Sequence, residues 1–258
     1  MTASRRRIRA VFLGLASFCL ILLLWEASIR GFHVRAVVLP APSDILAELV
    51  ADMAWYLSNA WHTLITTLFG FLLALVIGIF IAVLLVGMPW FESTIYPLII
   101  SFNSVPKVAV APLFVVWLGT GVKSQVAISF LIAVFAIIVD SAHGLRSIPA
   151  DVVDLGRILK GTRFDIFFKI RLPCALPSIL AGAKIAISLA LVGAIVGEFV
   201  ASEKGLGYII LSAQGSFEMP RVFAALFLLG GMGMLLFTAI EIVERRMLAW
   251  RYLDEQST

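Results

Sequence analysis

Long apolar runs are the feature that most restricts the fold of this chain. Six runs approach the roughly 20 mostly apolar residues that an α-helix needs to cross a bilayer. Apolar residues make up 61% of the 258 positions and charged residues only 14%, whereas a soluble domain carries about 25% charged residues. We therefore predict an all-α integral membrane protein with about six transmembrane helices in a single membrane domain, residues 1–258. The predicted spans are about 11–29, 63–86, 97–118, 126–143, 179–201 and 222–243.

Lysine and arginine are distributed unevenly between the two predicted sides of the membrane. Basic residues concentrate on the cytoplasmic side of membrane proteins, so with the N-terminus inside we predict thirteen of them in the cytoplasm and five outside. The cytoplasmic set is Arg5, Arg6, Arg7, Arg9, Arg146, Arg157, Lys160, Arg163, Lys169, Arg171, Arg245, Arg246 and Arg251, and the external set is Arg30, Arg35, Lys123, Lys204 and Arg221. This split requires an even number of spans with both termini cytoplasmic. The net charge of +4 is therefore attributed to topology and the lipid bilayer, and no nucleic-acid partner is expected.

The longest basic cytoplasmic segment, residues 146–177, is predicted to contain two helices. Pro149 suits the first turn of a helix, Gly161 can end it, and an apolar stripe lies between them. The stripe consists of Val152, Leu155, Ile158 and Leu159. This stripe must be covered, either by the chain's own membrane helices or by the groove of a cytoplasmic partner. We favour the partner.

A second helix is expected directly after Gly161. Thr162 and Asp165 have the spacing of a capping box, in which each side chain accepts from a backbone N–H at the start of the helix. The helix would run through Phe167 and Phe168. Pro173 and Pro177 are expected to end it, because proline cannot donate a helical hydrogen bond.

This loop carries a family resemblance. The stretch Asp154-Leu155-Gly156-Arg157-Ile158-Leu159-Lys160-Gly161, followed by Ile170-Arg171-Leu172-Pro173, resembles the cytoplasmic EAA loop of ABC importer permeases. Other stretches are similar to the branch that imports nitrate, sulfonates, taurine and related compounds. They are Leu39-Pro40-Ala41-Pro42, Val105-Pro106-Lys107, Ala111-Pro112-Leu113-Phe114, Trp117-Leu118-Gly119-Thr120-Gly121, Gly197-Glu198-Phe199 and Gly205-Leu206-Gly207-Tyr208.

The resemblance implies a type I ABC importer permease fold in the bacterial cytoplasmic (inner) membrane. It implies a second permease copy, most simply as a homodimer, two ATP-binding subunits, and an extracytoplasmic solute-binding protein. Residues 154–161 would form the coupling helix that docks on the ATPase. ATP and Mg²⁺ would be bound by the ATPase subunits, with no cofactor on this chain. The solute would be small and anionic or polar, nitrate-like, sulfonate-like, taurine-like or similar to a vitamin precursor.

The coupling segment departs from the family pattern at several positions. With Leu172-Pro173 aligned, Asp154 takes the place of the family's glutamate, and Leu155 and Gly156 replace its two alanines. Lys160 takes the glycine position, and Gly161 follows one residue late. We expect the bend to be preserved, with altered docking contacts.

Signatures of catalysis are missing from the sequence. It has no G-x-x-x-x-G-K-[ST] phosphate loop, no H-E-x-x-H and no G-x-S-x-G motif. We predict no catalytic residues and no metal site, since His33, His62 and His143 are scattered. A self-sufficient secondary transporter or channel is the alternative, although the paired broken helices of such proteins are not found. An intramembrane enzyme would need a nucleophile and base that the chain lacks.

Polar residues inside the spans are candidates for the solute pathway, because a charge at membrane depth is costly and calls for a reason. Lys107 interrupts the third span together with Asn103, Pro106 and Pro112. It either faces a polar or anionic solute or pairs structurally with Asp140 or a backbone carbonyl. The candidate pathway residues are Asn103, Ser104, Lys107, Ser188 and Glu198.

Glu198 and a stripe of small residues distinguish the fifth span. Glu198 would be either a gate or a partner of Lys204. The small residues would let another helix approach closely, along the central pathway or a dimer seam. The stripe comprises Gly182, Ala186, Ala190, Gly193 and Gly197.

Overall fold

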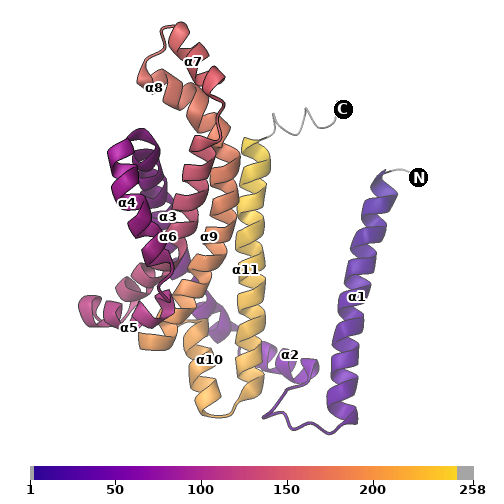
Figure 1. Ribbon diagram of the computed structural model, residues 1–258. Coiled ribbons are helices and arrows are strands. Elements are labelled where there is room, and N and C mark those ends of the chain that lie inside the picture. The colour runs from indigo at the N-terminus through magenta and orange to yellow at the C-terminus, as the bar shows by residue number, and fades with distance from the viewer. Residues whose placement is uncertain (1–2, 249–258) are drawn as a thin grey trace.

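The computed structural model describes residues 3–248, and the regular structure in this part of the chain is helical (Figure 1). The elements are α1 (Ala3–Gly31), α2 (Pro42–Ala51), α3 (Met53–Gly87), α4 (Pro89–Asn103), α5 (Lys107–Leu118), α6 (Val122–Arg146), α7 (Ala150–Ile158), α8 (Arg163–Ile166), the π-helical turn η1 (Phe167–Arg171), α9 (Leu172–Ala201), α10 (Leu206–Gly215) and α11 (Met219–Met247). Five stretches are long and apolar enough to cross a membrane: Phe12–Gly31, Met53–Gly87, Val122–Arg146, Phe164–Ala201 and Met219–Met247. Counting the bent pair α4–α5 as one span makes six.

The predicted third span is broken between α4 and α5, which are bent by 99°. The expected stretch 97–118 therefore consists of the second half of α4, a short break and α5. Pro106 explains the break, because it has no N–H to donate and disfavours helical conformation in the residue before it. The α4–α5 unit still returns the chain from the end of α3 to the start of α6 (Figure 1).

Helices α3, α6 and α9 form the centre of the bundle, with α6 between the other two. Glycines permit the close approach. A Cβ on Gly193 of α9 would lie 2.5 Å from Ser129 Cα, and one on Gly70 of α3 would collide with the Ser129 hydroxyl. That hydroxyl donates to the carbonyl of Ala190 at 2.8 Å. The stripe of small residues on α9 thus packs on α6 of the same chain. The expectation that it lines a pathway or a dimer seam is corrected accordingly.

The expectation that Pro173 and Pro177 end the second loop helix is wrong. The chain passes from α8 through η1 directly into α9, so one continuous helical segment leads from the loop into the membrane. Pro173 lies in the first turn of α9, where its missing N–H leaves no helical bond unmade. The π-helical turn lets the Leu172 N–H reach the Phe167 carbonyl, so the helix continues across the proline.

Helix α1 stands apart from the bundle and is attached at one end (Figure 1). The carboxylate of Glu26 accepts hydrogen bonds from the backbone N–H and the hydroxyl of Ser43, at 3.0 and 2.8 Å. Trp25 stacks near Phe227 of α11, with ring centroids 6.1 Å apart. The start of α1, the end of α11 and the α7–α8 loop all lie at one end of the molecule, opposite α2 and α10 (Figure 1).

Candidate functional site

Helix α7 ends in a Schellman motif, and a lysine occupies its left-handed position. Lys160 has φ +55°, and its N–H donates to the Arg157 carbonyl at 2.9 Å. The N–H of Gly161 donates to the Gly156 carbonyl at 3.0 Å. This pair of bonds defines the motif, and its left-handed residue is usually glycine. The bend expected from the resemblance is therefore present, with Lys160 adopting the conformation that glycine adopts more easily.

The two faces of α7 have different surroundings. Val153 is buried against the rest of the loop, and a Cβ on Gly156 would lie 2.9 Å from the side chain of Ile170. The opposite face is apolar and open: Leu155 is 56% exposed, Ile158 76% and Leu159 73%. The small residue at 156 is thus required by packing on η1, while the exposed leucines and isoleucine have no cover within the described part of this chain.

The predicted capping box is confirmed. The Asp165 N–H donates to the Thr162 hydroxyl at 3.1 Å, and the Thr162 N–H donates to the Asp165 carboxylate at 3.2 Å. Asp165 also pairs with Lys169 at 2.6 Å. These contacts satisfy the backbone at the start of α8 and link its first turn to η1. On α7, the exposed side chains of Asp154 and Arg157 form an ion pair at 2.9 Å.

Replacing Lys160 with glycine should stabilise the end of α7. Glycine adopts positive φ without the roughly 1–2 kcal/mol penalty of an L side chain. Hydrogen exchange at the backbone amides of positions 160 and 161 in the intact complex should be severalfold slower in the variant. An unchanged or faster exchange rate would contradict the assignment of the bend.

Lys107, the cation predicted to lie within the third span, is the first residue of α5 and directly follows the break. Lys107 Nζ lies 2.7 Å from Asn103 Oδ1 and 3.3 Å from the Asn103 carbonyl, and 4.8 Å from the ring centroid of Phe135 on α6. Asn103 and Lys107 are therefore hydrogen-bonded to each other, and Ser104, next to Asn103 in the chain, is exposed. Ser188 is exposed on α9 and donates to the Lys184 carbonyl of its own helix. Within the described residues, Lys107 contacts a backbone carbonyl, which is one of the two structural roles considered above, and its hydrogen bonds go to Asn103 and not to Asp140.

Glu198 connects α9 to α3 and to the start of α10. Its side chain is 1% exposed. One carboxylate oxygen accepts from the Thr63 hydroxyl at 2.8 Å, and the other accepts from the Gly207 N–H at 2.7 Å. The Thr63 hydroxyl in turn accepts from the Leu206 N–H at 2.9 Å. The carboxylate lies at a helix N-terminus, where negative charge is favourable. In the described part of the chain its partners are Thr63 and Gly207, and not Lys204.

The glycines around Glu198 explain two of the quoted stretches. Gly205 has φ +106°, and a Cβ there would collide with the Glu198 carboxylate. A Cβ on Gly207 would lie 2.9 Å from Glu198 Oε2, and the Gly205 N–H donates to Asn59 Oδ1 at 2.8 Å. Gly197-Glu198-Phe199 and Gly205-Leu206-Gly207-Tyr208 therefore form one unit, in which glycines leave room for a buried carboxylate. Sequence reasoning missed Asn59 and Thr63, because ordinary polar residues on an apolar helix do not reveal their distant partners.

Known proteins match the chain along most of its length. Residues 74–249, more than half of the chain, match the family described as "Binding-protein-dependent transport system inner membrane component". The chain belongs to this family of ABC importer permeases. Its members are the non-catalytic membrane components of such importers, bind no cofactor themselves, and work with ATPase subunits on other chains. The chain is therefore a multi-pass inner-membrane permease subunit.

Individual relatives of this permease have different solutes in their names. The formylaminopyrimidine transport permease protein ThiX of Halalkalibacterium halodurans is 33% identical, over 91% of this chain and 94% of its own length. The riboflavin transport system permease protein RibX of Chloroflexus aurantiacus is 33% identical, over 96% and 93%. The putative aliphatic sulfonates transport permease protein SsuC of Bacillus subtilis is 29% identical, over 92% and 87%.

Solved structures match the fold as well. A chain of the MetNI methionine ABC transporter, in an inward-facing conformation, superposes with a TM-score of 0.67 and 25% identity. The match covers 76% of this permease and 97% of that chain. The expected all-α permease fold is confirmed.

Proposed function

We propose that this permease forms half of a pathway for a small anionic or polar solute and is driven through α7. A second copy of the chain would supply the other half, and two ATP-binding subunits would bind beneath the pair. An extracytoplasmic binding protein would deliver the solute. The observation that carries the proposal is the exposed apolar face of Leu155, Ile158 and Leu159, on a helix whose other face is fixed to the loop.

The exposed face of α7 favours docking in a partner's groove over packing on the chain's own membrane helices. Residues 154–161 would enter the groove, with Leu155, Ile158 and Leu159 as anchors. Coupling requires that this contact differ in free energy between two global states. The continuous segment α8–η1–α9 is a direct connection for such a difference, since a displacement of the loop moves the start of a membrane helix.

The orientation follows from the position of this loop. ATP is present in the cytoplasm, so the end of the molecule that holds α7 would be cytoplasmic. The start of α1 and the end of α11 lie at that end (Figure 1), which supports cytoplasmic termini. The excess of lysine and arginine at the same end supports the same assignment.

Asn103, Ser104, Lys107 and Ser188 are the residues we propose for the pathway. Asn103, Ser104 and Ser188 are exposed. Their polar side chains and the cation at the α4–α5 break can bind a solute that carries oxygen acceptors. Glu198 is buried, so in this conformation it acts by positioning α10 and does not touch the solute. The solutes named for the relatives are all rich in such acceptors.

Replacing Lys107 with methionine tests the pathway. Methionine preserves the packing over Phe135 and removes the charge, so uptake of an anionic or polar solute should fall about tenfold while the ATPase complex stays assembled. The measurement is ATP-driven uptake by proteoliposomes holding the complete transporter, with the loaded binding protein supplied outside. Lys123→Met, at an exposed lysine in the first turn of α6, is the matched control. Loss of the assembled complex, or full uptake, would contradict a pathway role.

A further inference from the structure

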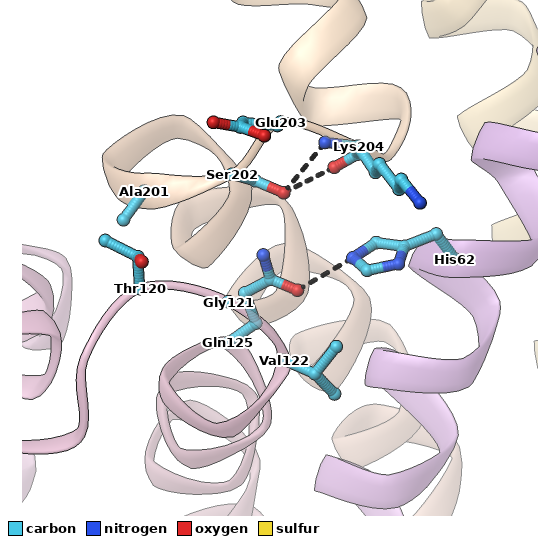
Figure 2. A pocket seen from close by; sticks show the side chains of 9 residues that line it. All are labelled: His62, Thr120, Gly121, Val122, Gln125, Ala201, Ser202, Glu203 and Lys204. Atoms are coloured by element: carbon cyan, nitrogen blue, oxygen red, sulfur yellow. Dashed lines mark hydrogen bonds between the residues drawn. The ribbon is translucent and has the colours of Figure 1, made fainter.

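A pocket lies at the outer end of the bundle, and none of the proposed pathway residues lines it. Its volume is about 440 Å³. Its walls come from α3, from the turn that leads into α6, and from the loop between α9 and α10 (Figure 2). Its polar and charged lining residues are His62, Thr120, Gln125, Ser202, Glu203 and Lys204.

Gln125 leaves an unsatisfied donor in this pocket. Its side chain is fully buried, and its Oε1 lies 3.0 Å from His62 Nε2. Its Nε2 has no hydrogen-bond partner among the residues that the structure describes. Figure 2 shows the amide oxygen directed at His62 and the nitrogen directed the other way, toward the side of the pocket where Ser202 lies. Buried polar groups without a partner are rare in native proteins and call for an explanation.

The walls of the pocket are held by hydrogen bonds and close packing. The Ser202 hydroxyl donates to the Lys204 carbonyl and accepts from the Lys204 N–H. The following residue, Gly205, is tied to Asn59 of α3. A Cβ on Gly197 would lie 2.8 Å from Gln125 Cα, so α9 fixes the backbone beneath the amide. Helix α6 therefore cannot shift at Gln125 to bring the unsatisfied nitrogen to another acceptor.

We propose that this outer pocket binds an oxyanion or carbonyl group of the solute, with Gln125 Nε2 as hydrogen-bond donor and Lys204 as the cation. The proposal rests on the proposed function, and it places a solute contact outside the pathway residues. His62 holds the amide so that its N–H groups face the pocket. Since the nitrogen is covered in this conformation, the solute has to displace the wall slightly, and satisfying a buried donor lowers the cost of that displacement.

Two charged side chains line the pocket, the cation of Lys204 and the carboxylate of Glu203. Lys204 is exposed and its side chain extends on the same side as His62 in Figure 2. The carboxylate of Glu203 lies beyond the Ser202 turn, away from Gln125 in this view. A negatively charged oxygen that reaches Gln125 therefore shares the pocket with the cation of Lys204.

A cysteine reporter in the complete transporter tests the pocket directly. Thr120→Cys lies in the wall, in a background where Cys19 and Cys174 are serine. Its thiolate displaces methanesulfinate from an anionic reagent, 2-sulfonatoethyl methanethiosulfonate, or from the cationic trimethylammonioethyl analogue. The ratio of anionic to cationic rates should fall about fivefold with Lys204→Gln. Arg35→Gln, an exposed outer cation that does not line the pocket, should leave the ratio unchanged.

Protection of the same cysteine by sodium methanesulfonate, at constant ionic strength, tests the amide. Gln125→Leu should raise the half-protecting concentration about tenfold, whereas Gln214→Leu, at an exposed glutamine of α10, should not. The proposal is overturned if methanesulfonate gives no protection, or if Lys204→Gln leaves the rate ratio unchanged. Lys204 is on the surface, so its variant remains informative even if Gln125→Leu does not fold. The labelling needs neither ATP nor a binding protein, so its failure would leave the proposed importer function standing.

Discussion

Replacing both Leu155 and Ile158 with aspartate is expected to abolish ATP-driven uptake while the permease still inserts and folds. The two side chains are 56% and 76% exposed, so docking in a groove would bury much of their apolar surface. That burial is worth about 3 kcal/mol, or roughly a hundredfold in the population of the docked state. Introducing two charges at the contact adds an unfavourable desolvation cost. The measurement is uptake by proteoliposomes together with retention of the ATPase subunits during purification.

A matched pair of conservative substitutions distinguishes the loss of apolar contact from a general effect of substitution at these two positions. Leu155→Met with Ile158→Val keeps the face apolar and should keep most of the uptake. The aspartate variant should elute from size exclusion as a folded permease, since both side chains point away from the packed face formed by Val153 and Gly156. Normal uptake by the aspartate variant would refute docking through this face.

Gly205→Ala is expected to destabilise the folded permease strongly. The added Cβ meets the Glu198 carboxylate, and φ at this residue is +106°. Overpacking and left-handed strain together should cost about 3 kcal/mol. For a chain of this size the midpoint of thermal unfolding should drop by roughly 6–12 °C. Gly215→Ala is the matched control, because a Cβ there meets nothing within 4 Å.

A double-mutant cycle identifies the cause of that loss. Glu198→Ala alone leaves the Gly207 N–H without its acceptor, at a cost of about 1–3 kcal/mol, whereas the Thr63 hydroxyl can still donate to the Asn59 carbonyl. In the double variant, Glu198→Ala removes the carboxylate with which the methyl group added at position 205 would collide. The free energy of unfolding lost by the double variant should therefore be smaller than the sum of the two single losses by at least about 1 kcal/mol. Strict additivity would show that Glu198 and Gly205 do not interact as described.

The membrane class and the capping box could be predicted from the sequence because both depend on local patterns. The runs of apolar residues required membrane helices, and the Thr162–Asp165 spacing required only that neighbouring residues be helical. The bend near Lys160 was expected from the family resemblance, although a lysine at positive φ could not be recognised from the residue type.

Long-range contacts could not be predicted in the same way. Glu198 appeared to be a gate or a partner of the nearby Lys204, whereas its partners are Thr63, more than a hundred positions earlier in the chain, and Gly207. The small residues of α9 were correctly expected to allow close packing, but which helix they meet depends on the tertiary arrangement. The error at Pro173 arose because a π-helical turn can absorb a proline at a helix start, and its sequence pattern is not distinctive.

The most direct test of this account is site-specific photocrosslinking from α7 in the assembled transporter. A photoreactive residue replacing Ile158 should crosslink to an ATP-binding subunit, and the yield should change when ATP replaces ADP, because the contact is expected to differ between the two states. The same residue replacing Phe217, which is exposed directly after α10 at the opposite end of the molecule, should give no such product. Crosslinks from Ile158 that form only within the permease, with none to an ATP-binding subunit in any nucleotide state, would contradict the central claim that α7 connects this chain to its ATPase.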